Sequence, residues 1–521
     1  MKKTTWFYVT ALALISFLFR LWGIRGNHPF WVDEFSTAAQ ANYYLKYGLG
    51  VFTNHAINLE GNNYTFHTLI ALSFRLFGTH EFAARLPAVI AGSLVPVALF
   101  FLAKKLFGIR TALVASLLTT FSYFQIVWSD QARSYSLLQL LTITTLYFYA
   151  QIIDHKSRTS RNILLFIISI LLGWFTHAQF IILLIALVGH FVLMRTASSL
   201  TYVKRRPIIS IVAFVIVGLF MAHMSRQGAI SPTGINNLWY YHSFLWREYG
   251  MITFVAILGI LAAFVSRRSN ALLVLTYLAV HFAFFSFGFR PYVSRYLLPI
   301  FPLFFMMFGY AITYGTELIC DQQKIKDGTI FNKFNLKLVI PLLLALFIIG
   351  NGYKFVFKPK PYYSINHDFR EIANIDYNRV YDLIKQKGHI SEGKTAVIDT
   401  WHDRLHWYLG EDYKAAYIFR WINDSGSING LTKTTNVVVA RSGEKYLDRV
   451  SNVRVIGDIT DLNRAMKQYP RGFLFIDDSS LPADVIHYAE TQMKKELFLD
   501  RYPLDDNPYS VWPATLYSWG L

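Results

Sequence analysis

The sequence predicts an α-helical polytopic membrane protein with a soluble α/β domain at its C-terminus. Of the 521 residues, 54% are hydrophobic, which is too high a content for a soluble protein. Charge divides the chain. Residues 1–357 hold 29 Lys and Arg against 10 Asp and Glu (net +19), whereas residues 358–521 hold 21 against 22 (net −1). We therefore predict a membrane domain over 1–357 and an α/β domain over 358–521, and we do not expect a nucleic-acid partner.

Uncharged apolar runs near the length of a membrane-crossing helix predict about eleven transmembrane helices. The first, Thr4–Phe19, has no cleavage site after it and is expected to be an anchor. Asn162–Met194 is long enough for two short passes, broken near Gly173–His177. The other predicted passes are Leu86–Ala103, Ala112–Ser129, Ser134–Ile153, Pro207–Ser225, Tyr249–Ser266, Ser269–Phe289, Tyr296–Thr316 and Leu338–Tyr353.

Basic clusters between alternate passes set the orientation through the positive-inside rule. These clusters are Lys2 and Lys3; Lys104, Lys105 and Arg110; Lys156, Arg158 and Arg161; Arg195, Lys204, Arg205 and Arg206; Arg267 and Arg268; and Lys324, Lys326, Lys333 and Lys337. All fall on one side once Asn162–Met194 is split in two. We expect a multi-pass protein of the cytoplasmic (plasma) membrane, with its N-terminus in the cytoplasm and its C-terminal domain outside.

The first outer loop, from Arg20 to Arg85, is not simply hydrophilic. Its stretches Phe35–Tyr47 and Tyr64–Phe77 are apolar and amphipathic, which predicts helices that lie along the membrane surface. The only cysteine, Cys320, is placed in a cytoplasmic loop. The outer domain therefore has no disulfide and no cysteine-based metal site.

In the C-terminal part, short apolar runs alternate with helical patterns, which predicts a small α/β sandwich. The predicted strands are Thr395–Asp399, Asn436–Ala440, Val453–Ile456 and Gly472–Ile476. The predicted helices are Asp376–Lys387, Asp461–Tyr469 and Pro482–Lys495. Acidic and histidine side chains after these strands, namely Asp399, His402, Asp403, Asp477 and Asp478, are interpreted as ordinary loop residues.

Asp33 and Glu34 follow the first hydrophobic segment on the predicted outer side. An acid at the membrane surface is a functional hypothesis by default, because ions are costly to hold near lipid. A pair of solvated loop charges is the alternative. Histidines 28, 55 and 67 share this loop. They leave room for a divalent metal, although no ligand spacing supports one.

Arginines at outer helix ends oppose the positive-inside bias. Arg85 begins the second pass, Arg133 follows Asp130 in a tight turn, and Arg295 precedes a late pass. Snorkelling to lipid phosphates explains any one of them. Several arginines that converge with acids are better explained by a site for a phosphate-bearing lipid. His177, at the break in the double pass, is weak evidence by itself.

Five stretches together resemble the membrane glycosyltransferases of the C superfamily, near glycosyltransferase family 39. That group includes protein O-mannosyltransferases and the aminoarabinose transferases that modify lipid A. The matching stretches, in the order of the family, are Trp31–Glu34, Glu81–Pro87, Ala132–Tyr135, Gly173–His177 and Ser294–Pro299. The chain departs from the pattern at Gln131, where the family usually has an acid before Ala-Arg. Asp130 is then either a shifted second acid or a bystander.

The resemblance implies transfer of a sugar from a polyprenyl-phosphate donor to an acceptor at the outer membrane face, with inversion. The acceptor is a lipid, a protein or a polysaccharide. Asp33 is the expected base, with Glu34 orienting it or the acceptor and Asp130 as a further catalytic candidate. Basic and aromatic side chains of the matched stretches are expected to bind substrate: Arg85, Arg133, Tyr135, His177, Arg295 and Tyr296.

Two other classes of protein remain as alternatives. A secondary transporter should show inverted repeats and discontinuous helices at the midplane of the membrane, and we find neither pattern in the sequence. A non-catalytic membrane scaffold that presents the outer domain would need neither the acidic pair nor the ordered arginines.

Overall fold

The computed structural model covers the full chain, and two compact units compose it. The first unit is Met1–Gly26, Gly61–Leu69 and Arg85–Tyr362, and the second is Asn27–Glu60, Ile70–Ala84 and Tyr363–Leu521. Much of the first outer loop thus belongs to the same unit as the C-terminal residues. The structure describes residues 3–25, 30–48, 63–154, 156–195, 234–290, 293–326, 336–351, 355, 375–410, 413–419, 439–442, 445–448, 453–477, 483–499 and 514–521. The domain boundary expected at residue 357 falls outside these ranges and stays a prediction.

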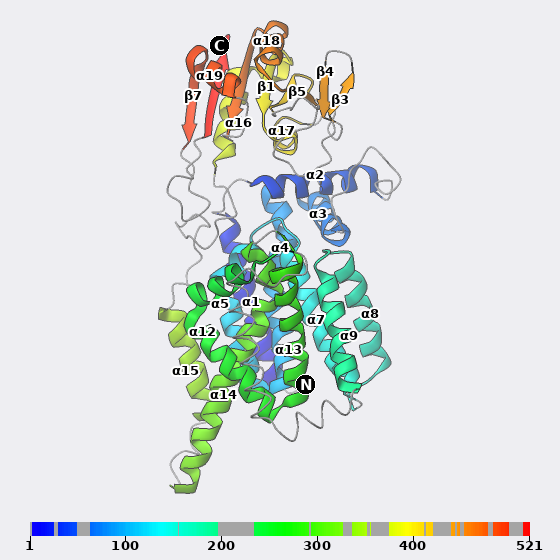
Figure 1. The fold of residues 1–521 in the computed structure, drawn as a ribbon, viewed down its shortest axis with the longest axis vertical. Helices are drawn as coiled ribbons and strands as arrows, with labels where there is room; N and C mark the ends of the chain where they lie inside the picture. Colours follow the sequence, from blue (N-terminus) through cyan, green and yellow to red (C-terminus); the bar gives the residue numbers. More distant parts are fainter. Residues whose placement is uncertain are drawn as a thin grey trace. The chain divides into compact units, whose positions relative to one another are not determined.

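The first unit is a bundle of helices (Figure 1). Its helices are α1 (Lys3–Arg25), α4 (Glu81–Phe107), α5 (Ile109–Phe121), α6 (Tyr123–Ser129), α7 (Tyr135–Ile153), α8 (Ser160–Trp174), α9 (Phe180–Arg195), α12 (Leu238–Ser266), α13 (Arg268–Ala283), α14 (Phe301–Lys326) and α15 (Leu336–Asn351). Within the described ranges, six helical segments are long and apolar enough to cross a membrane, and four shorter apolar helices accompany them. The chain is therefore a multi-pass membrane protein, as predicted.

Three details of the predicted passes can be compared with the bundle. The break within Asn162–Met194 is confirmed, because α8 ends at Trp174 and α9 begins at Phe180. The run Ala112–Ser129, predicted as one pass, is divided into α5 and α6 by extended backbone at Ser122. The pass predicted over Pro207–Ser225 lies outside the described residues.

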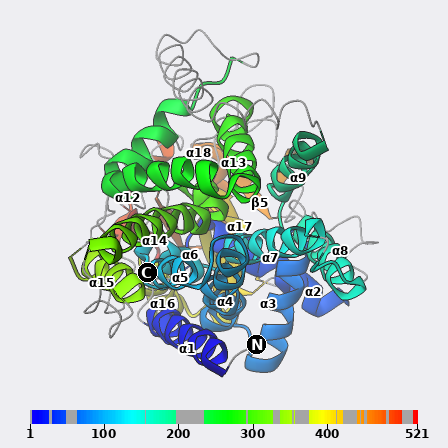
Figure 2. The ribbon, with the colours of Figure 1, turned by 90° about the horizontal axis from the view of Figure 1, so that it is seen from below.

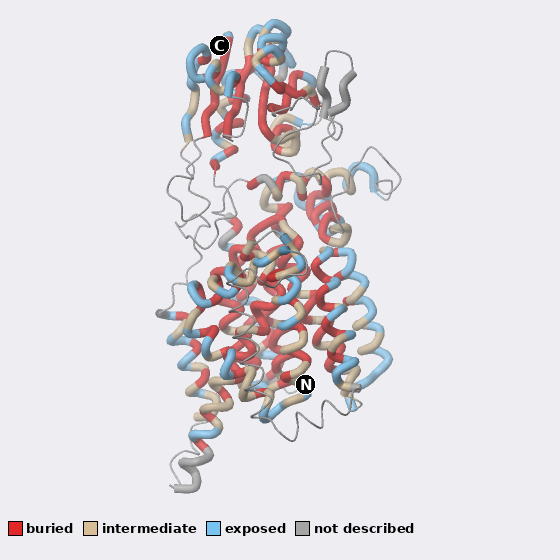
Figure 3. Tube along the Cα trace, in the orientation of Figure 1, coloured by how far each residue is buried: buried red, intermediate tan, exposed pale blue. Residues whose placement is uncertain are grey.

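Interior helices of the bundle pack closely. Viewed along the bundle, α4, α5, α6 and α14 lie inside, with α1, α8, α9 and α15 around them (Figure 2). The inward faces are buried, whereas the outer faces of α8 and α9 are exposed (Figure 3). Helices α12 and α14 meet at Gly259, where an added Cβ would lie only 1.9 Å from the carbonyl oxygen of Met307. Small residues permit such close approach between membrane helices.

Polar contacts gather several helix termini at one end of the bundle. Lys105 at the end of α4 pairs with Asp154 after α7 at 2.6 Å, and Arg110 at the start of α5 pairs with Glu317 near the end of α14 at 2.5 Å. Lys104 Nζ also donates to Thr5 Oγ1 of α1 at 3.3 Å. These contacts place the predicted cytoplasmic ends of α1, α4, α5, α7 and α14 together.

The second unit contains a mixed sheet of eight strands in the order β3-β4-β5-β2-β1-β6-β8-β7. The four central strands, β5 to β6 in this order, are parallel, and their neighbours on both sides are antiparallel. The strands are β1 (Thr395–Asp399), β2 (Ala416–Phe419), β3 (Val439–Ser442), β4 (Lys445–Asp448), β5 (Arg454–Ile456), β6 (Arg471–Ile476), β7 (Lys494–Leu499) and β8 (Ala514–Trp519). The helices of this unit are α2 (Val32–Tyr47), α16 (Tyr377–Gly388), α17 (His402–Leu409), α18 (Ile459–Gln468) and α19 (Ala483–Gln492), whereas α3 (Tyr64–Phe77) divides between the two units.

The predicted α/β class is confirmed, and so are both helices expected in the first outer loop, which are α2 and α3. The prediction that a helix continues to Lys495 is wrong. Helix α19 ends at Gln492 and β7 begins at Lys494, at the edge of the sheet. A charged start hides this strand in the sequence, because edge strands commonly carry lysines that discourage pairing with other chains.

Candidate functional site

Arg133 and Arg295 lie on a common aromatic surface in the first unit. The guanidinium carbons of Arg133 and Arg295 lie 5.9 and 5.8 Å from the centre of the Tyr135 ring. Arg295 also lies 5.9 Å from the ring of Trp128 and 5.9 Å from the ring of Tyr296. Guanidinium groups held over ring faces are oriented without losing their charge. We call Trp128, Arg133, Tyr135, Arg295 and Tyr296 the arginine–aromatic cluster.

Irregular backbone shapes this cluster. Arg133 lies between α6 and α7, and Arg295 and Tyr296 lie in the 3₁₀ helix η3 (Ser294–Ile300). The π turn η2 (Phe284–Gly288) after α13 stacks Phe285 on Tyr296 at 4.9 Å. Non-helical backbone at membrane depth is tolerated where it is buried in protein or lines a cavity. These breaks are therefore consistent with a binding site.

Buried polar atoms beside Tyr296 lack hydrogen-bond partners. Gln179 Nε2 and His281 Nε2 both bond the Tyr296 carbonyl oxygen, each at 2.8 Å. The remaining atoms Gln179 Oε1 and His281 Nδ1, and Nε1 of the nearby Trp128, are buried and unpaired within the described part of the chain. Such groups normally pair with protein, water or a ligand. Each of these atoms is therefore available to hydrogen-bond a water molecule or a polar ligand.

His177 packs on the cluster as a neutral imidazole. Its ring lies 5.2 Å from that of Tyr135, and its Nδ1 accepts a hydrogen bond from the Gln179 backbone at 3.1 Å. Burial, reinforced by the positive charges of Arg133 and Arg295, lowers the pKa of His177 to about 3. Burial and Arg133 likewise lower the pKa of His67 to about 3. Near neutral pH, His177 and His67 therefore add no positive charge of their own beside the two arginines.

Arg20 is a polar residue that the sequence analysis missed. It lies in α1, fully buried, and donates to Ser16 Oγ at 2.7 Å and to Ser129 Oγ at 3.1 Å. Asp130, the residue after α6, lies close enough to interact with the charge of Arg20. The sequence offered one signal for Arg20, because this charged residue directly follows the uncharged run Thr4–Phe19. Asp130 therefore has a charge partner at the packing contact of α1 with α6.

Asp33 and Glu34 lie in the first turn of α2, in the second unit. Glu34 is buried and its Oε2 accepts a long hydrogen bond of 3.5 Å from the backbone of Trp31, which closes the start of the helix. Asp33 is partly exposed. Carboxylates are stabilised at a helix N-terminus. The two acids therefore differ in environment, with Glu34 fixed in the helix cap and Asp33 more accessible.

The structure brings together five of the predicted site residues: Arg133, Tyr135, His177, Arg295 and Tyr296. Asp130 belongs to the same unit, as does Arg85, which is buried near the start of α4. The acidic pair is described within the second unit. Among the residues that the structure describes, no group of three His, Cys, Asp or Glu side chains could hold a metal ion. His28 and His55 lie outside them.

Comparisons with known proteins find similar molecules. Residues 65–225 match the family model described as dolichyl-phosphate-mannose-protein mannosyltransferase. A crystal structure of ArnT from Cupriavidus metallidurans in the apo state superposes with a TM-score of 0.58 at 12% identity, over 99% of this chain and 98% of that one. ArnT bound to undecaprenyl phosphate gives a TM-score of 0.57 at 13% identity, with the same coverage. A comparison with curated proteins found no match.

The chain resembles the membrane glycosyltransferases of the C superfamily. An oligosaccharyltransferase from Archaeoglobus fulgidus, tethered with an acceptor peptide, also shares the fold, with a TM-score of 0.54 and 11% identity over 92% of this chain and 69% of that one. At these identities the solved structures show the fold alone. The family model covers three of the five sequence stretches, whereas Trp31–Glu34 and Ser294–Pro299 lie beyond residues 65–225.

Proposed function

We propose that this protein transfers a sugar from a polyprenyl-phosphate-linked donor to an acceptor at the outer face of the cytoplasmic membrane. The observation that carries the proposal is the arginine–aromatic cluster. Two arginines share the ring of Tyr135 beside neutral His177. Such an environment favours an anionic headgroup, and one guanidinium group binds two phosphate oxygens through two parallel hydrogen bonds. The ArnT structure that binds undecaprenyl phosphate has the same fold, which supports a lipid-phosphate donor here.

In the proposed reaction the acceptor hydroxyl oxygen attacks the anomeric carbon of the donor. The bond from that carbon to the phosphate oxygen breaks, and the electron pair leaves with the lipid phosphate. Arg133 and Arg295, together with Arg85, stabilise the negative charge that grows on the phosphate. One displacement inverts the configuration of the sugar. The acceptor is a lipid, protein or polysaccharide hydroxyl.

Asp33 takes the proton from the acceptor hydroxyl in this mechanism, and Glu34 orients it. The environments of the two acids support this division, because Glu34 is buried in the helix cap whereas Asp33 is partly exposed. A carboxylate near low dielectric is a suitable general base. Asp130 is a weaker candidate, since Arg20 lies beside it.

The test is the transfer rate of purified Asp33→Asn enzyme with a polyprenyl-phosphate sugar as donor. Asparagine keeps the size of the side chain but cannot accept the proton, so turnover should fall roughly 10²–10⁴-fold. Binding of the donor should persist. Glu34→Gln is the matched control within the pair, and it should cost less because an amide can still cap α2. A rate for Asp33→Asn within a few-fold of wild type would exclude Asp33 as the base.

A further inference from the structure

The start of helix α2 packs against the C-terminal part of the second unit through aromatic rings. The Phe30 ring lies 4.9 Å from that of Trp407, and the Phe35 ring lies 5.8 Å from that of Tyr408. Phe30 and Phe35 are both fully buried, and they contact each other at 5.5 Å. The two phenylalanines flank Asp33 and Glu34 in the sequence. Contacts from α17 therefore hold both sides of the acidic pair.

The direction of Asp33 follows from helix geometry. Ala39 and Asn42 follow Phe35 at helical spacing, and with Asp403, His406 and Trp407 of the C-terminal part they line a cavity of about 90 Å³. This side of α2 therefore faces α17. Asp33 precedes Phe35 by two residues, which is a rotation of about 200° around the helix axis. Docking of α2 on α17 thus directs Asp33 away from the sheet.

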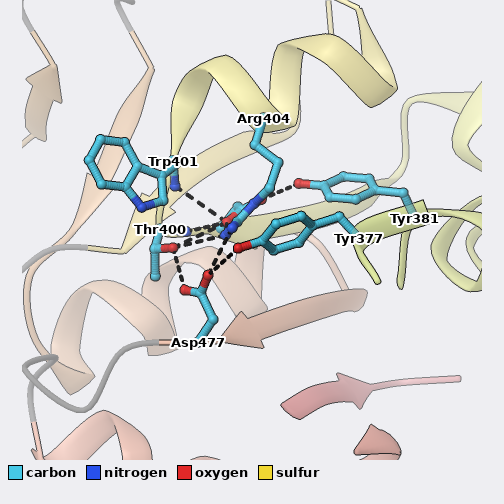
Figure 4. Close-up of polar contacts among 7 residues, drawn as sticks. Tyr377, Tyr381, Thr400, Trp401, Arg404 and Asp477 are labelled. Carbon is cyan, nitrogen blue, oxygen red and sulfur yellow. Dashed lines mark hydrogen bonds and ion pairs between the residues drawn. The ribbon is translucent and has the colours of Figure 1, made fainter. Parts of the chain in front are cut away.

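Helix α17, which contacts α2, also takes part in a buried ion-pair network (Figure 4). Arg404 of α17 donates from Nε to Asp399 at the end of β1 at 2.9 Å, and from a terminal nitrogen to Asp477 after β6 at 2.8 Å. Arg404 is fully buried. The interpretation of Asp399 and Asp477 as ordinary loop residues is therefore wrong. Sequence reasoning missed the network because its partners come from different strands.

The network occupies the position where ligands usually bind in sheets of this kind. Strands β2 and β5 continue the parallel sheet on one side of β1, and β6 lies on the other. The order reverses between β1 and β6, and crevices at such a switch point commonly bind ligands at the carboxyl ends of the strands. Here Arg404, which also donates to Thr400 at 2.9 Å, fills that point. A buried side chain of the protein itself thus occupies this point.

Tyr377 connects the network to α2. Its ring centre lies 4.3 Å from the guanidinium carbon of Arg404 and 5.8 Å from the ring of Phe35. Tyr381, one turn further along α16, hydrogen-bonds Asp399. Arg404 is also three and four residues before Trp407 and Tyr408 on α17. The network therefore orders both helices whose aromatic side chains hold α2.

We propose that the C-terminal α/β domain positions the acidic pair, with Trp407 and Tyr408 as positioning residues that act on Asp33 through Phe30 and Phe35. This inference rests on the proposed function, in which Asp33 is the base. In this role the C-terminal domain affects turnover without binding a ligand itself. A base displaced by about 1 Å costs on the order of 10²-fold in rate.

The test compares Trp407→Leu with Trp519→Leu in the full-length enzyme. Trp519 lies in β8, buried in the core of the same sheet, so its replacement removes a similar side chain without touching α2. We expect Trp407→Leu to lower kcat about 10²-fold with an unchanged KM for the donor. Trp407→Phe should restore most of the rate. Hydrogen exchange of the α2 backbone amides should rise in Trp407→Leu and stay unchanged in Trp519→Leu.

The outcomes distinguish the positioning role of Trp407 from the proposed role of Asp33 as the base. Equal losses of kcat in Trp407→Leu and Trp519→Leu, tracking their melting temperatures, would overturn the positioning role. Wild-type kcat in Trp407→Leu would do the same while leaving Asp33 as the base. If Asp33→Asn stays active, the proposed base fails, yet faster amide exchange in α2 still reports whether Trp407 holds the helix. Should Trp407→Leu not fold, Phe30→Leu removes the same ring contact from the α2 side.

Discussion

Arginines in this protein occupy two kinds of environment. Arg404 is enclosed by carboxylates, and Arg20 by hydroxyl groups and backbone carbonyls. Arg133 and Arg295 instead lie over aromatic rings beside neutral histidines. The first kind stabilises packing, since a buried charge needs partners. The second kind belongs to the cluster that we propose as the donor site. The same residue type thus supports the fold at some positions and the proposed chemistry at others.

Replacement of Arg133 should affect the donor rather than the acceptor. Lysine keeps the charge but lacks the planar fork that binds a phosphate through two hydrogen bonds. We expect Arg133→Lys to lower the rate of sugar transfer roughly 10²-fold, near the lower bound for the loss of one preorganised hydrogen-bond donor. Arg110→Lys is the control, because Arg110 pairs with Glu317 at the other end of the bundle. Wild-type donor affinity in both Arg133→Ala and Arg295→Ala would contradict the assignment.

His177 should make the stability of the protein depend on pH. Its pKa is about 3 in the fold, against 6.5 as the ordinary value, so the unfolded chain binds more protons below pH 6.5. Stability must therefore fall as the pH drops from 6.5 toward 3, by on the order of 2 kcal/mol at pH 5. The decrease in melting temperature from pH 7.5 to pH 5 should therefore shrink in His177→Gln relative to the wild-type protein. It should not shrink in His80→Gln, which removes an exposed histidine.

Individual elements were predictable where one local signal determined them. Apolar length located the membrane helices, and amphipathic spacing located α2 and α3. The break at Ser122 carries no Gly or Pro signal, and the π turn η2 contains a glycine only at its last residue, Gly288. The strand β7 begins with Lys494 and Lys495, which read as part of a helix. Local pattern therefore failed where tertiary packing determined the backbone.

Helix spacing in the bundle should depend on Gly259. An added Cβ would lie 1.9 Å from a backbone carbonyl of α14, and backbone cannot move aside as a flexible side chain can. Overpacking costs typically about 1–3 kcal/mol, so Gly259→Ala should lower the melting temperature in detergent. Gly315→Ala on α14 is the control, since nothing lies within 4 Å of its added Cβ. Equal melting temperatures for the two variants would show that α12 and α14 do not require this contact.

At the scale of the whole molecule, the sequence predicted the architecture more fully than the candidate site. Charge and hydropathy separated a membrane part from an α/β part, and the resemblance selected Arg133, Tyr135, His177, Arg295 and Tyr296. Neither signal showed that residues of the first outer loop belong to the α/β unit. That arrangement depends on contacts such as Phe30 with Trp407, between segments far apart in sequence. Pairwise contacts of this kind leave no local pattern.

The last prediction concerns the side of the membrane on which the α/β domain lies. The basic termini of α4 and α5 share one end of the bundle with the start of α1 and the end of α14. The positive-inside rule predicts that this end is cytoplasmic. With an odd number of passes, we then predict that residues after Tyr353 lie outside the cytoplasm. A reporter that is active only in the cytoplasm should therefore be silent when fused after Lys360.

The same reporter fused after Arg158, between α7 and α8, is the matched control and should be active. Arg158 follows Asp154, which pairs with Lys105 at the basic end of the bundle. Activity at both positions would mean that the number of passes before Lys360 is even. Asp33 would keep its place after the first pass, but the domain that we propose to hold its helix would lie on the other side of the membrane. The positioning role and the outer-face reaction could not then both be correct.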